Sequence, residues 1–226
     1  MGVFFNMYVD SVKIGGNRLE QKSYHHGNLR NTLIETGIAL LNEQGQEQFS
    51  LRKVAAKCGV SHAAPYSHFE NKEALLEAMK QYVTEQFTQA LQKTAEQHKN
   101  DIDILFHLGN TYISFFAEHK PYFTFLYHKS GIQFDFSEEG IAKNSYPPCA
   151  IFKKEAFALM EKINFPEQKR IDALIALLAL VHGITAMLTT EQLNYDTDYQ
   201  KLFQNSILAN ALFTNRILKQ KGEEII

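Results

Sequence analysis

Apolar residues recur at the three- and four-residue spacing of an α-helix along nearly the whole of this 226-residue chain. No internal repeat or low-complexity tract interrupts that spacing. The pattern predicts an all-α fold, and a chain of this length can bury a substantial core without disulfides. Its two cysteines, Cys58 and Cys149, fit neither a disulfide framework nor a metal-ligand spacing, which suits a reducing cytoplasm.

A polar arm over residues 1–26 precedes the first predicted helix, which is expected to start near residue 27 or 28 and to end at Gly45. Glycine suits this end because it adopts the left-handed conformation that closes a helix. The buried face of this helix shares one helical spacing and consists of Leu29, Leu33, Ile34, Gly37, Ile38 and Leu41.

Two shorter helices are expected next, separated by a glycine turn. Ser50 can cap the first, which ends at Gly59, and Ser61 can cap the second, expected over residues 62–69. Two short helices joined by such a turn have the arrangement of a helix-turn-helix, whose second helix enters the major groove of DNA. The sequence therefore predicts a three-helix DNA-binding domain over residues 27–72.

A helical bundle is expected over residues 73–226, with Gly131–Pro147 as a loop. Its predicted helices all show the same periodicity and lie at Asn71–His98, Ile102–Ala117, Pro121–His128, Pro148–Lys162, Pro166–Thr190 and Asp198–Gln220. Residues 173–190 carry no charge, but the strongly apolar part stops near Val181, so we expect no membrane span and a helix buried on all sides in the protein interior or in a dimer interface. No secretory signal is expected at residues 1–10.

The second short helix of the predicted helix-turn-helix offers groups suited to a DNA groove. Ala63 and Ala64 are small enough for close approach to base edges, and His62 can form a hydrogen bond to a base or a phosphate. Arg52, on the helix before it, is long enough to reach a base or the backbone. The groups expected to contact phosphates are hydroxyls, an imidazole and ammonium groups, on Ser50, Lys53, Ser61, Tyr66, His68 and Lys72.

Three segments, reading FSLRKVA over 49–55, CGVS over 58–61 and YSHFENKEALL over 66–76, closely resemble the signature of the TetR family of DNA-binding regulators. Carried over by position, the resemblance implies base-reading roles for Arg52, His62, Ala63 and Ala64. It implies backbone-contacting roles for Ser50, Ser61, Tyr66, His68 and Lys72, whereas Lys53 is expected to act through its charge alone. The Ala63–Tyr66 run looks like the subgroup whose C-terminal domain is named for a Trp-His-Gly motif. Here that motif would read Val181-His182-Gly183, with valine in place of tryptophan.

The resemblance also implies a homodimer whose C-terminal domain senses a small molecule. The predicted body is rich in aromatic residues with interspersed histidines, a composition that can enclose a mainly apolar cavity for a small apolar or aromatic ligand. The candidate ligand-binding residues are Phe116, His119, Phe123, Tyr127, Phe152, His182 and Met187.

The last two predicted helices carry more apolar surface than a small domain usually needs, and they are expected to form the two-fold interface. The candidate interface residues are Leu174, Leu178, Val181, Phe203, Ser206 and Phe213. A two-fold dimer would match a palindromic operator in double-stranded DNA.

The expected function is that of a cytoplasmic repressor, released from its operator when a small molecule binds the C-terminal domain. The alternative is a helical ligand-binding or adaptor protein without DNA binding, which the charge favours: nine basic residues stand against eight acidic ones through Lys80. No enzyme, cofactor or metal site is expected. Glycine-framed nucleophile and phosphate-loop motifs are missing, and the pair His25-His26 lacks further ligands.

Overall fold

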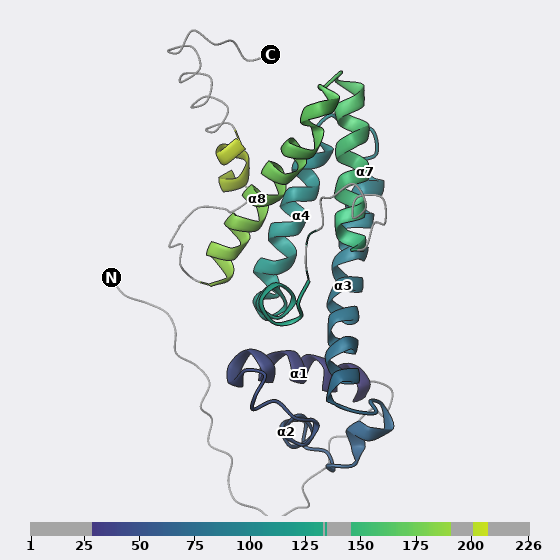
Figure 1. Ribbon diagram of the computed structural model, residues 1–226, viewed down its shortest axis with the longest axis vertical. Helices are drawn as coiled ribbons and strands as arrows, with labels where there is room; N and C mark the ends of the chain where they lie inside the picture. The colour runs from purple at the N-terminus through teal and green to yellow at the C-terminus, as the bar shows by residue number, and fades with distance from the viewer. Residues whose placement is uncertain (1–28, 133, 135–145, 191–200, 208–226) are drawn as a thin grey trace, which may run out of the picture.

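The computed structural model describes residues 29–132, 134, 146–190 and 201–207, and every regular element within these ranges is helical (Figure 1). The predicted all-α fold class is thereby confirmed. The described helices form a small group at one end of the molecule and a longer bundle beside it, and the helix α3 runs from the first into the second. The arm over residues 1–26 lies outside the described residues.

The small group consists of α1 (Leu29–Gln44), α2 (Leu51–Lys57) and the short 3₁₀-helix η1 (Ala64–Ser67). The expected caps are present. Ser50 Oγ accepts a hydrogen bond from the Lys53 backbone N–H at 3.3 Å and so starts α2. Gly45 and Gly59 have φ angles of +76° and +69°, the left-handed conformation expected at these two turns.

The second short helix of the motif is shorter than predicted. Residues 62–69 were expected to be helical, whereas the structure has a 3₁₀-helix of four residues at Ala64–Ser67, flanked by turns. Pro65 explains the difference, because it has no backbone N–H and cannot donate the i→i−4 bond that would begin an α-helix there. The backbone N–H groups of Ala64 and Tyr66 instead bond the carbonyls of Ser61 and Ala63, three residues back.

The helix α3 (Lys72–Gln97) begins at Asn71, whose Oδ1 accepts a hydrogen bond from the Ala74 backbone N–H at 2.8 Å. Its first turns pack on α1 across Gly37, where an added Cβ would lie 3.0 Å from Met79 Sδ. The predicted domain boundary between residues 72 and 73 falls inside α3. The division of the chain into two domains stays a prediction.

The bundle consists of α3, α4 (Ile104–Glu118), α5 (Lys120–Thr124), the π-helical turn η2 (Phe125–Lys129), α7 (Pro147–Lys162), the 3₁₀-helix η3 (Glu167–Lys169) and α8 (Arg170–Thr189). The helices α4 and α7 begin and end within two residues of the expected limits. In Figure 1 the helices α4 and α8 run side by side, and α7 lies along the upper half of α3.

The last described segment, residues 201–207, is helical and packs against α4. Phe203 is fully buried, and its ring lies so close to Gly109 that a Cβ there would be 2.3 Å from a ring atom. Glycine at position 109 therefore permits this contact between two segments far apart in the sequence.

The helix α8 is apolar around much of its circumference. Among the described residues, the segment Glu167–Thr189 is long and apolar enough to cross a membrane by length and composition, with a mean hydropathy of 2.1 and only 22% of that stretch buried. Its exposed face includes Ile175, at 39% exposure, and Met187, at 41%. Within one chain, α8 is therefore buried on only one face, and burial of the other face in a dimer interface stays a prediction.

Candidate nucleic-acid interface and ligand core

The surface around η1 carries polar and aromatic side chains that face away from the core. Ser61, His62, Ala63 and His68 are exposed, and Tyr66 leaves 53% of its surface in solvent although it is a large aromatic residue. Tyrosine combines an apolar ring with a hydrogen-bonding hydroxyl, so an exposed one suits a polar, partly apolar surface such as the edge of a DNA groove.

This surface is held in place from below by Pro65 and Phe69, which are buried. The guanidinium of Arg30, from α1, lies 5.5 Å from the centre of the Phe69 ring. Such a cation–π contact holds the end of η1 against the first helix. The exposed residues of η1 therefore sit on a rigid base that three elements of the module share.

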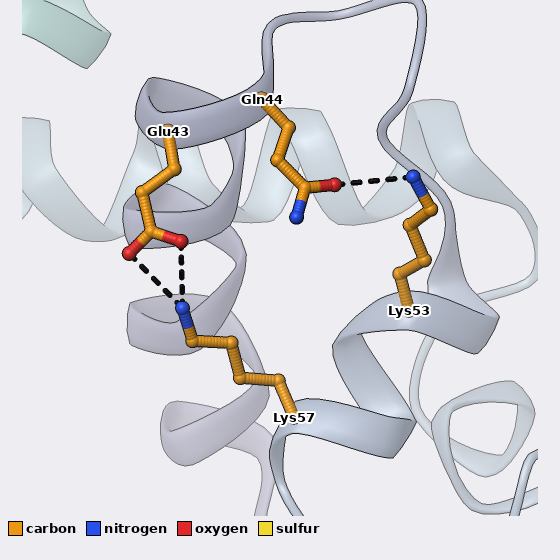
Figure 2. A network of polar contacts seen from close by, with 4 residues as sticks. All are labelled: Glu43, Gln44, Lys53 and Lys57. Carbon is orange, nitrogen blue, oxygen red and sulfur yellow. Dashed lines mark hydrogen bonds and ion pairs between the residues drawn. The ribbon is translucent and has the colours of Figure 1, made fainter.

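Three lysines near the interface contact their own module, and Figure 2 shows two of them. Lys53 Nζ donates to Gln44 Oε1 at 3.1 Å, and Lys57 Nζ forms an ion pair with Glu43 at 2.7 Å, so both tie α2 to the end of α1. Lys72 Nζ donates to the Gln46 carbonyl oxygen at 2.7 Å. Exposed pairs of this kind contribute little stability, so these ammonium groups can exchange their partners for phosphates at small cost.

The predicted DNA-contacting residues fall into two groups. Ser50 and Ala64 are half-buried and shape the ends of helices, as Lys72 does at the start of α3, whereas Arg52 and the exposed residues of η1 face solvent. The sequence interpretation omitted Ser67 and Arg30, which are also exposed beside Tyr66 and Phe69. The position of Ser67 within the second short helix was the signal that could have identified it.

In the bundle, His182 of α8 is surrounded by aromatic rings from three other segments. Its Nδ1 lies 2.9 Å from the hydroxyl oxygen of Tyr112, and its ring lies 5.0 Å from Phe123 and 4.8 Å from Tyr127. Burial, with the nearby His128 as a second cause, lowers the pKa of His182 below its ordinary value of 6.5. A neutral imidazole with its proton on Nε2 can accept a hydrogen bond at Nδ1 from the Tyr112 hydroxyl.

Five of the seven predicted ligand-binding residues meet in this aromatic core, namely Phe116, Phe123, Tyr127, Phe152 and His182. His119 lies apart, exposed and stacked on Tyr122 at 5.0 Å, and Met187 lies on the exposed face of α8. Tyr112 belongs to the core but was not among the predicted residues, because its spacing on α4 does not distinguish it from the other aromatic residues there. Ligand binding by these residues stays a prediction.

Phenol and thiol groups in the core are kept neutral by burial. Burial raises the pKa of Tyr112, Tyr127 and Tyr146, and it raises the pKa of the Cys149 thiol to about 12. The core can therefore offer neutral hydrogen-bonding groups among apolar rings, which suits an uncharged polar group on an otherwise apolar ligand.

The aromatic core connects directly to the small N-terminal group of helices. Phe123 lies on α5, and on the same short helix the Pro121 carbonyl oxygen accepts a hydrogen bond from Asn42 Nδ2 of α1 at 2.7 Å. Tyr82 of α3 donates to Glu35 Oε1 of α1 at 2.7 Å. A movement of α5 would therefore be passed to α1 through the hydrogen bond between Asn42 and Pro121.

The predicted dimer residues lie on more than one face. Leu174, Val181 and Phe203 are buried within the chain, so they offer little surface to a partner, whereas Leu178 and Ser206 are half-buried. Phe213 lies outside the described residues. The apolar surface of α8 that is exposed belongs instead to Ile175, Ala176, Ala179 and Met187. Spacing alone could not separate these faces, because both are apolar.

Comparisons with known proteins agree with this architecture. Residues 33–79 match the model described as "Bacterial regulatory proteins, tetR family". The chain is similar to the tetracycline repressor protein class A from transposon 1721 of Escherichia coli, at 47% identity over 49 residues, 22% of this chain and 23% of the repressor. It is also similar to the class G repressor of Vibrio anguillarum, at 44% over 50 residues, 22% of this chain and 24% of the repressor. The match thus spans about a quarter of these relatives' length.

Two solved structures share the fold over most of the chain. A TetR-like transcriptional regulator from Rhodococcus sp. RHA1 superposes with a TM-score of 0.60 at 16% identity, covering 78% of this chain and 92% of the other. FadR from Bacillus subtilis, solved in complex with stearoyl-CoA, superposes with a TM-score of 0.60 at 17% identity, covering 79% and 95%. At these identities the similarity shows the fold over the matched four fifths of the chain, while the family match is confined to residues 33–79.

Proposed function

We propose that this chain, whose residues 33–79 match the tetR family of bacterial regulatory proteins, is a sequence-specific DNA-binding transcriptional regulator of that family. We take it to be a cytoplasmic repressor that binds a palindromic operator as a homodimer and is released by a small molecule. The observation that carries the proposal is the exposed surface of η1, on which Tyr66 stands out at 53% exposure.

The exposed residues of η1 suit a DNA groove because their chemistry is mixed and their base is rigid. Hydroxyl and imidazole groups can bond phosphates and base edges, and small side chains such as Ala63 let the backbone come close. Arg52 adds a cation that can bond a base with two N–H groups. Lys53 and Lys57 contact the end of α1 through exposed side chains, and their ammonium groups can bind phosphates instead.

The proposed dimer would form through the exposed apolar face of α8. Ile175 and Met187 mark its two ends, and the small residues Ala176 and Ala179 between them allow a second helix to approach closely. An apolar face of this length is unfavourable in water, and a second copy of the chain offers the same face by two-fold symmetry.

Ligand release would act through α5. An apolar ligand entering the aromatic core at Phe123 and His182 would displace α5, and the hydrogen bond from Asn42 to Pro121 would pass that shift to α1. The long α3 would carry the same movement along its axis to the first helices. A coupling of roughly 1–3 kcal/mol is enough to weaken operator binding usefully.

The test is selection of bound DNA from a random pool at stated salt, followed by binding measurements on the selected sequence. We expect a palindromic site, and we expect Arg52→Ala and Tyr66→Ala each to weaken binding by about 1–3 kcal/mol, roughly 5- to 150-fold. Gln89→Ala, an exposed change on α3 far from η1, serves as the matched control and should bind as the wild type does.

Folded variants that bind DNA as tightly as the wild type would contradict the role given to η1. If the pool yields no enriched sequence, the alternative of a helical ligand-binding or adaptor protein is favoured. The nearly neutral charge of the first 80 residues is the observation that favours this alternative.

A further inference from the structure

The turn between α3 and α4, at the opposite end of α3 from η1, brings together two histidines and two aspartates. We propose that His98, Asp101 and His107 form a binding site for a divalent transition-metal ion of the Zn²⁺ type. One potential ligand atom from each of the three residues lies within 4.8 Å of the other two. This proposal does not depend on DNA binding.

The geometry of the cluster is close to that of a metal site. His98 Nδ1 lies 3.0 Å from Asp101 Oδ2, and the rings of His98 and His107 stack with centroids 3.5 Å apart at an interplanar angle of 11°. Ligand atoms in a tetrahedral zinc site are roughly 3.4 Å apart, given metal–ligand distances of about 2.1 Å. The stacked rings and the Asp101 carboxylate would have to turn so that their ligand atoms point at one ion, and the exposure of these side chains leaves room for that rotation.

The neighbouring groups support the same assignment. Asp103 Oδ2 lies 3.3 Å from His107 Nε2, so it can hold that ring in position or supply a fourth ligand. The turn itself is held by Lys162 of α7, whose Nζ donates to the Asn100 carbonyl oxygen at 3.1 Å. The spacing of Asp103 and His107, four residues apart at the start of α4, places both on one helix face.

A groove beside the histidines leaves room for further ligands. It has a volume of about 430 Å³ and is lined by His98, His107 and Asn110 among other residues of α3 and α4.

The ligand set selects the class of metal. Two imidazole nitrogens with one or two carboxylates suit Zn²⁺, Co²⁺ and Ni²⁺, whereas Mg²⁺ and Ca²⁺ prefer oxygen ligands alone. A bound ion would join the last turn of α3 to the first turn of α4. Because only the folded chain brings the three ligands together, the ion would raise the melting temperature.

The test uses the full chain, stripped of metal with a chelator and dialysed. Zn²⁺ binding is measured by equilibrium dialysis, Co²⁺ binding by its visible absorption, and the melting temperature with and without Zn²⁺. We expect about one ion per chain, and affinity at least about tenfold weaker in His98→Gln/His107→Gln. His25→Gln/His26→Gln removes two adjacent histidines outside the cluster. This variant is the matched control and should bind as the wild type does.

The substituted side chains are partly exposed, at 32% for His98 and 30% for His107, so the variant should fold, and circular dichroism checks this. If the double histidine variant does not fold, Asp101→Asn is measured in its place, because the loss of a carboxylate ligand alters the Co²⁺ spectrum. Unchanged binding and spectra in these variants would overturn the proposal. So would binding that is lost only in the His25/His26 variant, or a wild type that binds neither ion.

Discussion

His182 is half-buried among aromatic rings, and its protonation state decides how well that core is held together. The Tyr112 hydroxyl lies within hydrogen-bond distance of Nδ1, and burial favours the neutral imidazole by lowering the pKa of His182. Charging the ring would place a cation beside His128 and remove the acceptor for Tyr112. A single proton is therefore expected to change the stability of the helical bundle.

The stability of the chain should fall as pH drops below about 6.5. The pKa of His182 is lowered in the folded state, so below its ordinary value of 6.5 the unfolded chain binds more protons than the folded chain, and the free energy of unfolding decreases. The slope should stay well below about 1.4 kcal/mol per pH unit, the limit for one proton, because the ring is only half-buried.

The measurement is the urea midpoint between about pH 5 and pH 8. His182→Asn keeps an acceptor near the Nδ1 position but does not titrate, so its midpoint should depend less on pH in this range. His119→Gln removes an exposed histidine and should keep the slope of the wild type. Identical slopes for the wild type and His182→Asn would show that His182 does not titrate differently on folding.

At the scale of elements, α3 is the helix on which both parts of the molecule depend. Its first turns contact α1 through Leu75 and Met79, and its last turn ends beside the His98 cluster. The start of this helix is determined by Asn71, since the side-chain acceptor satisfies a backbone N–H that has no partner within the helix. The first turn of α3, which packs on α1, is thus stabilised by a cap from one exposed residue.

Asn71→Ala should lower the free energy of unfolding by about 1 kcal/mol, because it removes this cap. Asn71→Ser keeps a side-chain acceptor at the same position and should lose much less. Chemical denaturation of the two variants beside the wild type measures the difference. Equal losses for alanine and serine would mean that the hydrogen bond to the Ala74 N–H is not what stabilises the helix start.

At the scale of the whole molecule, α8 leaves one apolar face towards the core and another towards solvent. Leu174 and Val181 are buried in the chain, whereas Ile175 and Met187 are exposed. The exposed face is the surface through which we propose that two copies associate. Association would also align two DNA-binding modules for the two halves of a palindromic site.

Ala179→Arg should convert the dimer into a monomer, because it places a charge in the middle of the proposed interface. Sedimentation velocity over a range of concentrations measures the change, and we expect dissociation at least tenfold easier, by about 1.4 kcal/mol or more. Ile163→Arg changes another exposed apolar residue, outside α8, and should leave the dimer intact. A monomeric wild type, or a variant that remains dimeric, would remove α8 from the interface.

The sequence by itself determined the helical class, the caps at Ser50 and Asn71 and the glycine turns at 45 and 59. These features depend on interactions within a few residues, so the order of amino acids specifies them directly. The shortening of the second motif helix to η1 has an equally local cause in Pro65, which the prediction of a helix over 62–69 underestimated.

Only the tertiary structure decided which residues meet across long stretches of chain. It buried Phe203 against Gly109, placed His182 beside Tyr112, and brought His98 to His107 across the turn between α3 and α4. A helix such as α8 is apolar on several sides, so its periodicity does not show which face meets the core. That choice is made by the packing of all the helices together, because burial depends on shape complementarity between segments distant in sequence.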